Sequence, residues 1–418
     1  MAGCPEAPPP PPPPKRAAPR AATPTPSQPH APMTQSELAT TDGQIAVDNL
    51  SAALAGAEVA LRSNPQVAAA YSKVVQLLRM RGLFLGRLAD YEQAAAVSAQ
   101  QVKAVPKEAQ TYQMRAAVRS TFHDFAGALA DLDQSEKLGA SAAANLEERA
   151  ALLVATGRVD EALALLGKLS GPARDAMTQG AHASLLGELG QLDQAEAMFI
   201  EAQKLLPDVS PFPLAWVYFQ QGLMWENAGR SGRARELYAA AAERVPGYAA
   251  ATSHLAAMEA ASGERDRAIE RLREIVKTSD DPEHQAQLSA LLKESGHAVD
   301  AEELRRRAQE RYAALLKRYP AAFAAHAARF YLGVGAEAQS AVKWAEQNLK
   351  NVPTVEAHAL AIEANLAARA TARACALADQ LTAKPRLSAR AKVMAARAYV
   401  ACGKQPAADA LLGSGAQK

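Results

Sequence analysis

In this 418-residue chain, the side chains best suited to redox or metal chemistry belong to three cysteines and eight histidines. No histidine has a second histidine or a cysteine three or four positions away, the spacing that would place two metal ligands on one helix face. The sequence also lacks HExxH, CxxC, GxSxG and a phosphate-binding glycine loop. We therefore expect no catalytic residue, no metal site, no cofactor and no small-molecule substrate.

Two of the cysteines, Cys375 and Cys402, are separated by 27 positions near the carboxyl end. The helices expected there are adjacent and antiparallel, which would bring both thiols to the same end of the pair. A disulfide between them is geometrically feasible and would suit an oxidising compartment. The alternative is that both act as small buried apolar residues between alanine-rich helices.

The third cysteine, Cys4, follows Ala2 and Gly3. This tripeptide resembles the cleavage site of a bacterial lipoprotein signal, although Met1 stands where that site has a large aliphatic residue. The resemblance implies lipidation of Cys4 and a periplasmic, outer-membrane-anchored protein. The proline-rich residues 5–35 would then form an extended spacer. The alternative is an ordinary amino terminus in the cytoplasm.

A regularly repeated alanine indicates which secondary-structure elements would position these residues. It recurs every 33 or 34 residues, with two longer intervals of 39 and 40. A period near 34 is typical of stacked helix–turn–helix units. The ten anchor alanines are Ala94, Ala128, Ala162, Ala195, Ala234, Ala268, Ala301, Ala341, Ala374 and Ala408.

Other residues keep the same register as the anchors. Six anchors have glycine five positions before them, and four have proline twelve positions after them. Glycine readily takes the left-handed conformation that ends a helix, whereas proline cannot continue a helix interior. We therefore predict a turn just before each anchor and, in four units, a helix end at the proline.

The segments 190–207 and 229–246, GQLDQAEAMFIEAQKLLP and GRSGRARELYAAAAERVP, resemble tetratricopeptide repeats (TPRs). The resemblance implies an all-α, right-handed α-solenoid superhelix of about ten repeats. We expect a disordered proline-rich tether over 1–40 and a capping helix over 41–67. Repeats one to four would cover 68–208, repeats five to seven 209–320, and three degenerate repeats 321–418.

The two long intervals predict insertions. The first would be a proline-stiffened loop over 208–213, and the second a helix that runs on to Tyr319 before Pro320. In solenoids such insertions often modify one face or mark a seam between stacks. A neutral insertion is the alternative.

Aromatic residues are concentrated after the first insertion: five of 21 (3 Trp, 10 Tyr and 8 Phe) lie between positions 212 and 225. Trp216, Phe219 and Leu223 share one helix face. Because aromatic side chains are common anchors of protein interfaces, we predict that this face binds a partner. The alternative is that it belongs to the core.

A second group lies after the longer insertion and has the same spacing. Phe323, His326 and Phe330 occupy positions i, i+3 and i+7 of the expected helix. We predict that they form a smaller partner-binding group.

Charge argues against nucleic acid as a partner. Lysine and arginine total 46 against 44 aspartate and glutamate, which leaves no general basic footprint. The densest basic cluster, around Arg306, is interleaved with glutamates and is typical of a solvated helix face.

These features predict a non-enzymatic scaffold or adaptor that binds proteins or peptides in the concave groove of the array, in the bacterial periplasm. A membrane would be contacted only through a lipid on Cys4, because no apolar stretch reaches about 18 residues. The alternatives are an accessory subunit of a cell-envelope enzyme or secretion complex, and a cytoplasmic scaffold.

Overall fold

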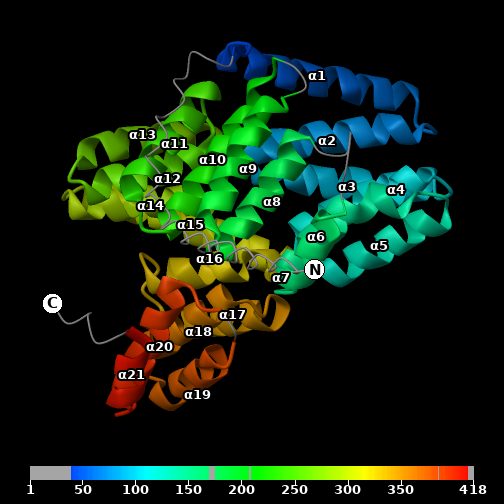
Figure 1. Ribbon diagram of the computed structural model, residues 1–418. Helices are drawn as coiled ribbons and strands as arrows, with labels where there is room; N and C mark the ends of the chain where they lie inside the picture. Colours follow the sequence, from blue (N-terminus) through cyan, green and yellow to red (C-terminus); the bar gives the residue numbers. More distant parts are fainter. Residues whose placement is uncertain (1–38, 169–174, 207–208, 385, 413–418) are drawn as a thin grey trace, which may run out of the picture. The chain divides into compact units, whose positions relative to one another are not determined.

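The computed structural model describes residues 39–168, 175–206, 209–384 and 386–412. Residues Met1–Ala39 and Thr40–Lys418 separate into two units, and the second contains all the helices discussed below. Its described residues form 21 α-helices and no strand. The all-α repeat fold expected from the sequence is therefore confirmed (Figure 1).

Ten helical hairpins follow one another along the chain, each made of an even-numbered helix and the odd-numbered helix after it. The first helices of the hairpins are α2 (Ala68–Leu85), α4 (Ala109–Thr121), α6 (Leu146–Ala155), α8 (Ala176–Glu188), α10 (Pro211–Asn227), α12 (Ala249–Ala261), α14 (Pro282–Glu294), α16 (Pro320–Leu332), α18 (Val355–Ala367) and α20 (Ala389–Ala401). A short 3₁₀ turn, η2 (Ala142–Asn145), precedes α6.

One additional helix, α1, precedes the first hairpin and occupies the place of a second helix. No first helix lies before it among the described residues. The second helices are α1 (Gly43–Ser63), α3 (Leu88–Ala104), α5 (Phe125–Lys137), α7 (Val159–Leu166), α9 (Leu192–Lys204), α11 (Ser231–Arg244), α13 (Arg265–Thr278), α15 (Ala298–Arg318), α17 (Ala338–Asn351), α19 (Thr371–Thr382) and α21 (Gln405–Leu412).

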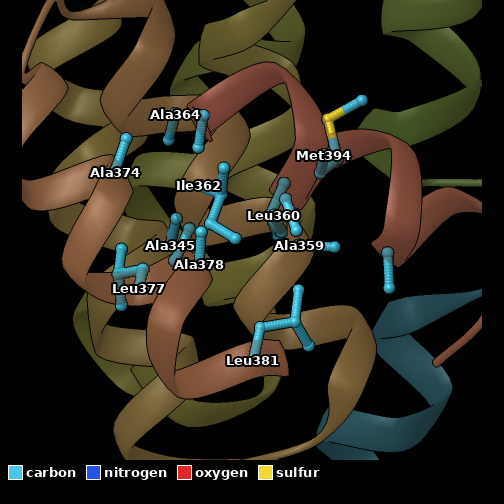
Figure 2. Packing of buried hydrophobic residues seen from close by; sticks show 14 of the residues in the cluster. Ala345, Ala359, Leu360, Ile362, Ala364, Ala374, Leu377, Ala378, Leu381 and Met394 are labelled. Atoms are coloured by element: carbon cyan, nitrogen blue, oxygen red, sulfur yellow. The ribbon is translucent and has the colours of Figure 1, made fainter. Parts of the chain in front are cut away.

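All ten anchor alanines lie near the start of a second helix, and each is at most 3% exposed. A methyl side chain at this position lets the first helix of the same hairpin approach closely. The last repeats show the result: alanines from α17, α18 and α19 alternate with a few leucines such as Leu377 and Leu381 in one cluster (Figure 2). The core is thus built from many small contacts.

The turn before each anchor has a fixed backbone conformation. In nine of the ten repeats the residue five positions before the anchor has a positive φ, between 50° and 86°. Six of these residues are the predicted glycines, but His123, Ala336 and Arg369 take the same conformation without being glycine. After Arg369, the Ala370 amide donates to the Asn365 carbonyl at 2.8 Å, the closing bond of a Schellman turn.

Three segments expected from the sequence can be compared with the helix bounds. The capping helix α1 begins after Asp42, whose carboxylate accepts from the Gln44 and Ile45 amides. The long helix α15 ends at Arg318, and its C-cap Tyr319 directly precedes Pro320. The expected loop over 208–213 is shorter, because α10 already begins at Pro211. Proline suits the first helical position, where its missing amide hydrogen has no intrahelical partner.

Repeats about six apart along the chain are in direct contact. The joining hydrogen bonds and ion pairs link residues 168 to 228 positions apart. The Ser279 hydroxyl donates to the Gly86 carbonyl at 2.6 Å, and the rings of Phe122 and Tyr319 stack with centroids 3.9 Å apart. In each case a turn inside an early hairpin meets the junction between two later hairpins.

Both insertions take part in these distant contacts. Val209, before α10, accepts from the Thr41 amide at 2.7 Å, and Phe212 lies 4.8 Å from Phe84 between ring centroids. The extended end of α15 supplies Arg318, which pairs with Glu92 at 2.5 Å. The insertions therefore join parts of the array that are distant in sequence.

The turn conformation yields a first prediction. Replacing Arg369 with glycine should raise the free energy of unfolding by about 0.5–1 kcal/mol, because a non-glycine residue is strained at positive φ. Gly263→Ala should lower it by about 1 kcal/mol; a Cβ added at Gly263 meets no atom within 4 Å, so this variant isolates the backbone effect. Urea unfolding measures both. Equal stability of all three proteins would show that the turns do not impose this conformation.

The distant contacts yield a second prediction. Phe122→Ala and Tyr319→Ala, alone and together, should show a coupling energy of about 0.5–1.5 kcal/mol in a double-mutant cycle of unfolding free energies. Val299 is 83% exposed on α15, the helix that Tyr319 follows, so Phe122→Ala with Val299→Ala should be additive. An additive Phe122–Tyr319 cycle would mean that the two repeats do not touch in solution.

Candidate functional site

The predicted partner-binding face lies on α10, which neighbouring helices hold on both sides. Gly222 lets α11 approach, because a Cβ at this position would be only 2.6 Å from the ring of Tyr238. On the other side, Glu196 of α9 accepts from the Gln221 side chain at 2.6 Å and from the Trp225 indole at 3.0 Å. The orientation of α10 is therefore fixed by packing and by a half-buried carboxylate.

Trp216 is half-buried and packs toward the preceding repeat. A Cβ added at Gly180 of α8 would lie 2.7 Å from the indole ring, so the ring lies directly on the backbone of that helix. Beside this contact, the partly exposed Ser184 hydroxyl is 3.4 Å from the Gln220 side-chain oxygen. Trp216 is thus packed on α8, and Ser184 and Gln220 lie one turn after Gly180 and Trp216 on their respective helices.

Phe219 and Leu223 are also half-buried, but they pack toward the following repeat. The Phe219 ring centroid lies 5.7 Å from that of Tyr238, 5.4 Å from Tyr248 and 5.6 Å from His254. The three predicted residues therefore share one helix but divide between two core clusters.

A carboxylate organises the polar edge of the Phe219 cluster. Glu226 accepts from the Tyr238 hydroxyl at 2.6 Å and pairs with His254 Nδ1 at 2.9 Å. The His254 hydrogen bond, helped by that of Tyr238, lowers the pKa of Glu226 against the effect of burial. A carboxylate with a depressed pKa in the folded state stabilises the fold above its unfolded pKa. That contribution is lost as the pH falls through the folded value.

The second predicted group, on α16, also divides between core and surface. Phe330 is 4% exposed, and its ring centroid is 5.2 Å from that of Tyr312. In this structure Phe330 is therefore a core residue and not an accessible contact, contrary to the expectation. Phe323 and His326 are partly exposed, with ring centroids 6.3 Å apart.

His326 belongs to an ion pair that the sequence did not reveal. Its Nδ1 lies 2.7 Å from the Glu283 carboxylate of α14, and the two side chains are 41% and 38% exposed. Surrounding protein disfavours the charged carboxylate, but His326 outweighs this and lowers the pKa of Glu283 to about 2. Burial opposes the charge on His326 as well, yet Glu283 raises its pKa. At the nearby Asp281 burial is the stronger effect, and it raises the pKa of that carboxyl group.

Glu196, Glu226 and Glu283 were missed in the sequence because their partners lie in other helices. His254 is 28 positions from Glu226, and His326 is 43 positions from Glu283. Neither separation is a local helix spacing, and neither equals the repeat. The interleaved charges around Arg306 could be predicted, since they are i,i+3 and i,i+4 neighbours, and their pairing is confirmed.

The described residues contain no group of three or more His, Cys, Asp or Glu side chains arranged to hold a metal ion. Among the same residues, no helix is long and apolar enough to cross a membrane. Cys4, the predicted lipidation site, lies outside the described residues.

Cys375 lies near the start of α19, and Cys402 directly follows the end of α20. The two Cα atoms are 6.6 Å apart in a disulfide arrangement. This separation is within the range that a disulfide can span. Cys375 is 8% exposed, so water has little access to its sulfur.

The third prediction concerns this pair. If the bond forms, closing a loop of 27 positions should add roughly 3–4 kcal/mol to the free energy of unfolding. Denatured, oxidised protein should then show no reactive thiol other than Cys4, and reduction should lower the unfolding temperature. Two further reactive thiols under oxidising conditions would show that the pair is not bridged.

No sequence profile of a known protein family matches the chain, and no curated protein matches it. Several solved structures are similar to it. YrrB, a TPR protein with an unusual peptide-binding site, is 17% identical, covering 47% of this chain and 95% of its own, with a TM-score of 0.27. The P58(IPK) TPR domain is 14% identical over 86% of this chain and 95% of its own, with a TM-score of 0.28.

A chain of the APC/C hetero-tetramer Cut9–Hcn1 is 14% identical over 87% of this chain and 89% of its own, with a TM-score of 0.34. Both the sequence identities and the TM-scores of these structures are low. The repeat assignment rests on the molecule itself, on its ten buried anchors and the turns before them. By these features the chain is an array of ten tetratricopeptide-like helical hairpins.

Proposed function

We propose that this chain is a non-enzymatic protein–protein interaction scaffold that binds a peptide or protein segment along its first helices. One observation carries the proposal: Trp216, Phe219 and Leu223 remain half-buried after the repeats have packed. Repeat arrays offer extended surfaces for partners, and interface hot spots are enriched in aromatic side chains that are already rigid and partly desolvated. α10 is therefore the central contact.

The surroundings of Trp216 favour a partner with both apolar and hydrogen-bonding groups. Its ring is held on Gly180, so little side-chain freedom remains to be lost on binding. Ser184 and Gln220 beside it supply hydroxyl and amide groups that can bond a peptide backbone. An extended segment with one apolar side chain over Trp216 would use both features.

The fourth prediction tests this assignment with peptides selected from a random-peptide display library on the full chain. Trp216→Ala combined with Phe219→Ala should weaken their binding by about 30-fold, which corresponds to about 2 kcal/mol. Val299→Ala is the matched control, because Val299 is 83% exposed on α15, and it should leave binding unchanged.

Thermal unfolding of the same proteins separates binding from packing. Truncating a core aromatic typically costs about 3–5 kcal/mol of stability. A double variant that melts much earlier would show that these residues hold repeats together. A double variant that melts normally and binds the selected peptides as tightly as before would place the partner elsewhere on the array.

We further propose that the scaffold works on the periplasmic side of a bacterial envelope, tethered through Cys4. Support comes from the Ala2-Gly3-Cys4 sequence and from the disulfide arrangement of Cys375 and Cys402, a bond typical of oxidising compartments. An accessory subunit of an envelope enzyme would share this location but should copurify with one catalytic partner in fixed stoichiometry.

The fifth prediction is that native protein labelled with a palmitate analogue carries the label on Cys4 and sediments with membranes. Cys4→Ser should release it in soluble form with unchanged circular dichroism. Mass spectrometry that finds an unmodified Cys4 in the cells of origin would refute the tether and leave the cytoplasmic scaffold.

A further inference from the structure

At the two ends of the hairpin array, each end helix has an apolar face that no other described helix covers. Inside an array every hairpin packs against neighbours on both sides, whereas a terminal repeat lacks one neighbour and usually has a polar outer face. Here the end helices are α1 at the amino side and α20 with α21 at the carboxyl side. Both depart from the usual polar cap.

On α1 the uncovered face is a stripe of apolar and small residues. Ile45 and Val59 are 55% and 54% exposed, and Ala52 and Gly56 lie between them on the same side of the helix. A Cβ added at Gly56 would meet no atom within 4 Å, so nothing in the described chain covers this side. The opposite face, which includes Leu50 and Leu54, is buried.

At the other end α20 exposes two valines one heptad apart. Val393 and Val400 are 42% and 52% exposed, and Leu412 of α21 is 41% exposed. The opposite face of α20 is buried through residues such as Met394 and Tyr399. Both end helices are thus anchored on one side and apolar on the other.

The two end helices carry opposite net charge. From Asp42 to Ser63 there are three acidic residues and one arginine, a net charge of 1 − 3 = −2. From Ala389 to Ala401 there are three basic residues and no acid. Arg390 already pairs with Glu363 of α18 at 2.7 Å, so Lys392 and Arg397 are the two cations that this helix offers to a partner. Among the described residues, Lys392 and Arg397 have no carboxylate partner and Asp48 has no cation; Asp48 accepts only from Gln44.

We propose that α1 of one copy of this chain docks on α20 and α21 of a second copy, head to tail. The apolar stripes would cover each other, and Asp48 would face Lys392 and Arg397 across the contact. Because the two surfaces differ, the contact is heterologous and would build rings or open chains of copies. This self-assembly goes beyond the proposed binding of a partner at α10 and does not depend on it.

Sedimentation velocity of the full chain tests the proposal over a range of protein and salt concentrations. We expect reversible association that weakens as ionic strength rises, since screening reduces attraction between exposed charges. Val393→Asp combined with Val400→Asp should weaken association at least tenfold. Val299→Asp places the same charge on an exposed valine away from both ends and should leave it unchanged.

A charge exchange identifies the two faces. A tail variant, Lys392→Glu with Arg397→Glu, and a head variant, Asp48→Lys with Asn49→Lys, should each stay monomeric because like charges then meet. An equimolar mixture of the two should associate again, since each variant then meets a face of opposite charge. Circular dichroism confirms that all variants remain helical.

Three results would overturn the proposal. The first is a chain that stays monomeric at all concentrations tested, including low salt. The second is association that the end variants do not change, which would place the contact elsewhere. The third is a mixture of the head and tail variants that fails to associate although both are folded.

Discussion

The close approach of two helices at a buried alanine is the contact on which the rest of this structure depends. Each of the ten anchors has almost no exposed surface, so a larger side chain there would separate the helices of its hairpin. The turn just before the anchor takes a left-handed residue in nine of ten repeats. Together the turn and the methyl group set the distance between the two helices of each hairpin. The contacts between hairpins depend on that distance, including the pairs that join repeats about six apart.

Three glutamates on or next to the first helices have different roles. Glu196 of α9 bonds to α10, and Glu226 of α10 bonds to His254 of α12, whereas Glu283 pairs with His326 on an accessible surface. Surface pairs of this kind contribute little to stability. This pair places charge next to the partly exposed ring of Phe323.

Much of the fold could be predicted because its signals are local and repeated. The anchors, the six glycines and the end of α15 before Pro320 are each set by residues within one hairpin or at its end. The site was less accessible to prediction. Phe330 has the same spacing as an interface residue, but Tyr312, outside α16, buries it. The contacts between distant repeats are not marked by any periodic pattern in the sequence. Residues of both insertions nevertheless take part in them.

The central claim, that the buried anchors determine the array, is tested most directly by the free energy of unfolding of Ala234→Leu measured beside Ala239→Leu. Both residues lie on α11; Ala234 is buried and Ala239 is exposed. Leucine forms helices nearly as well as alanine, so helix propensity does not distinguish the two variants. The account predicts a loss of about 1–3 kcal/mol for Ala234→Leu through overpacking and almost none for Ala239→Leu. Equal stability of the two variants would contradict it.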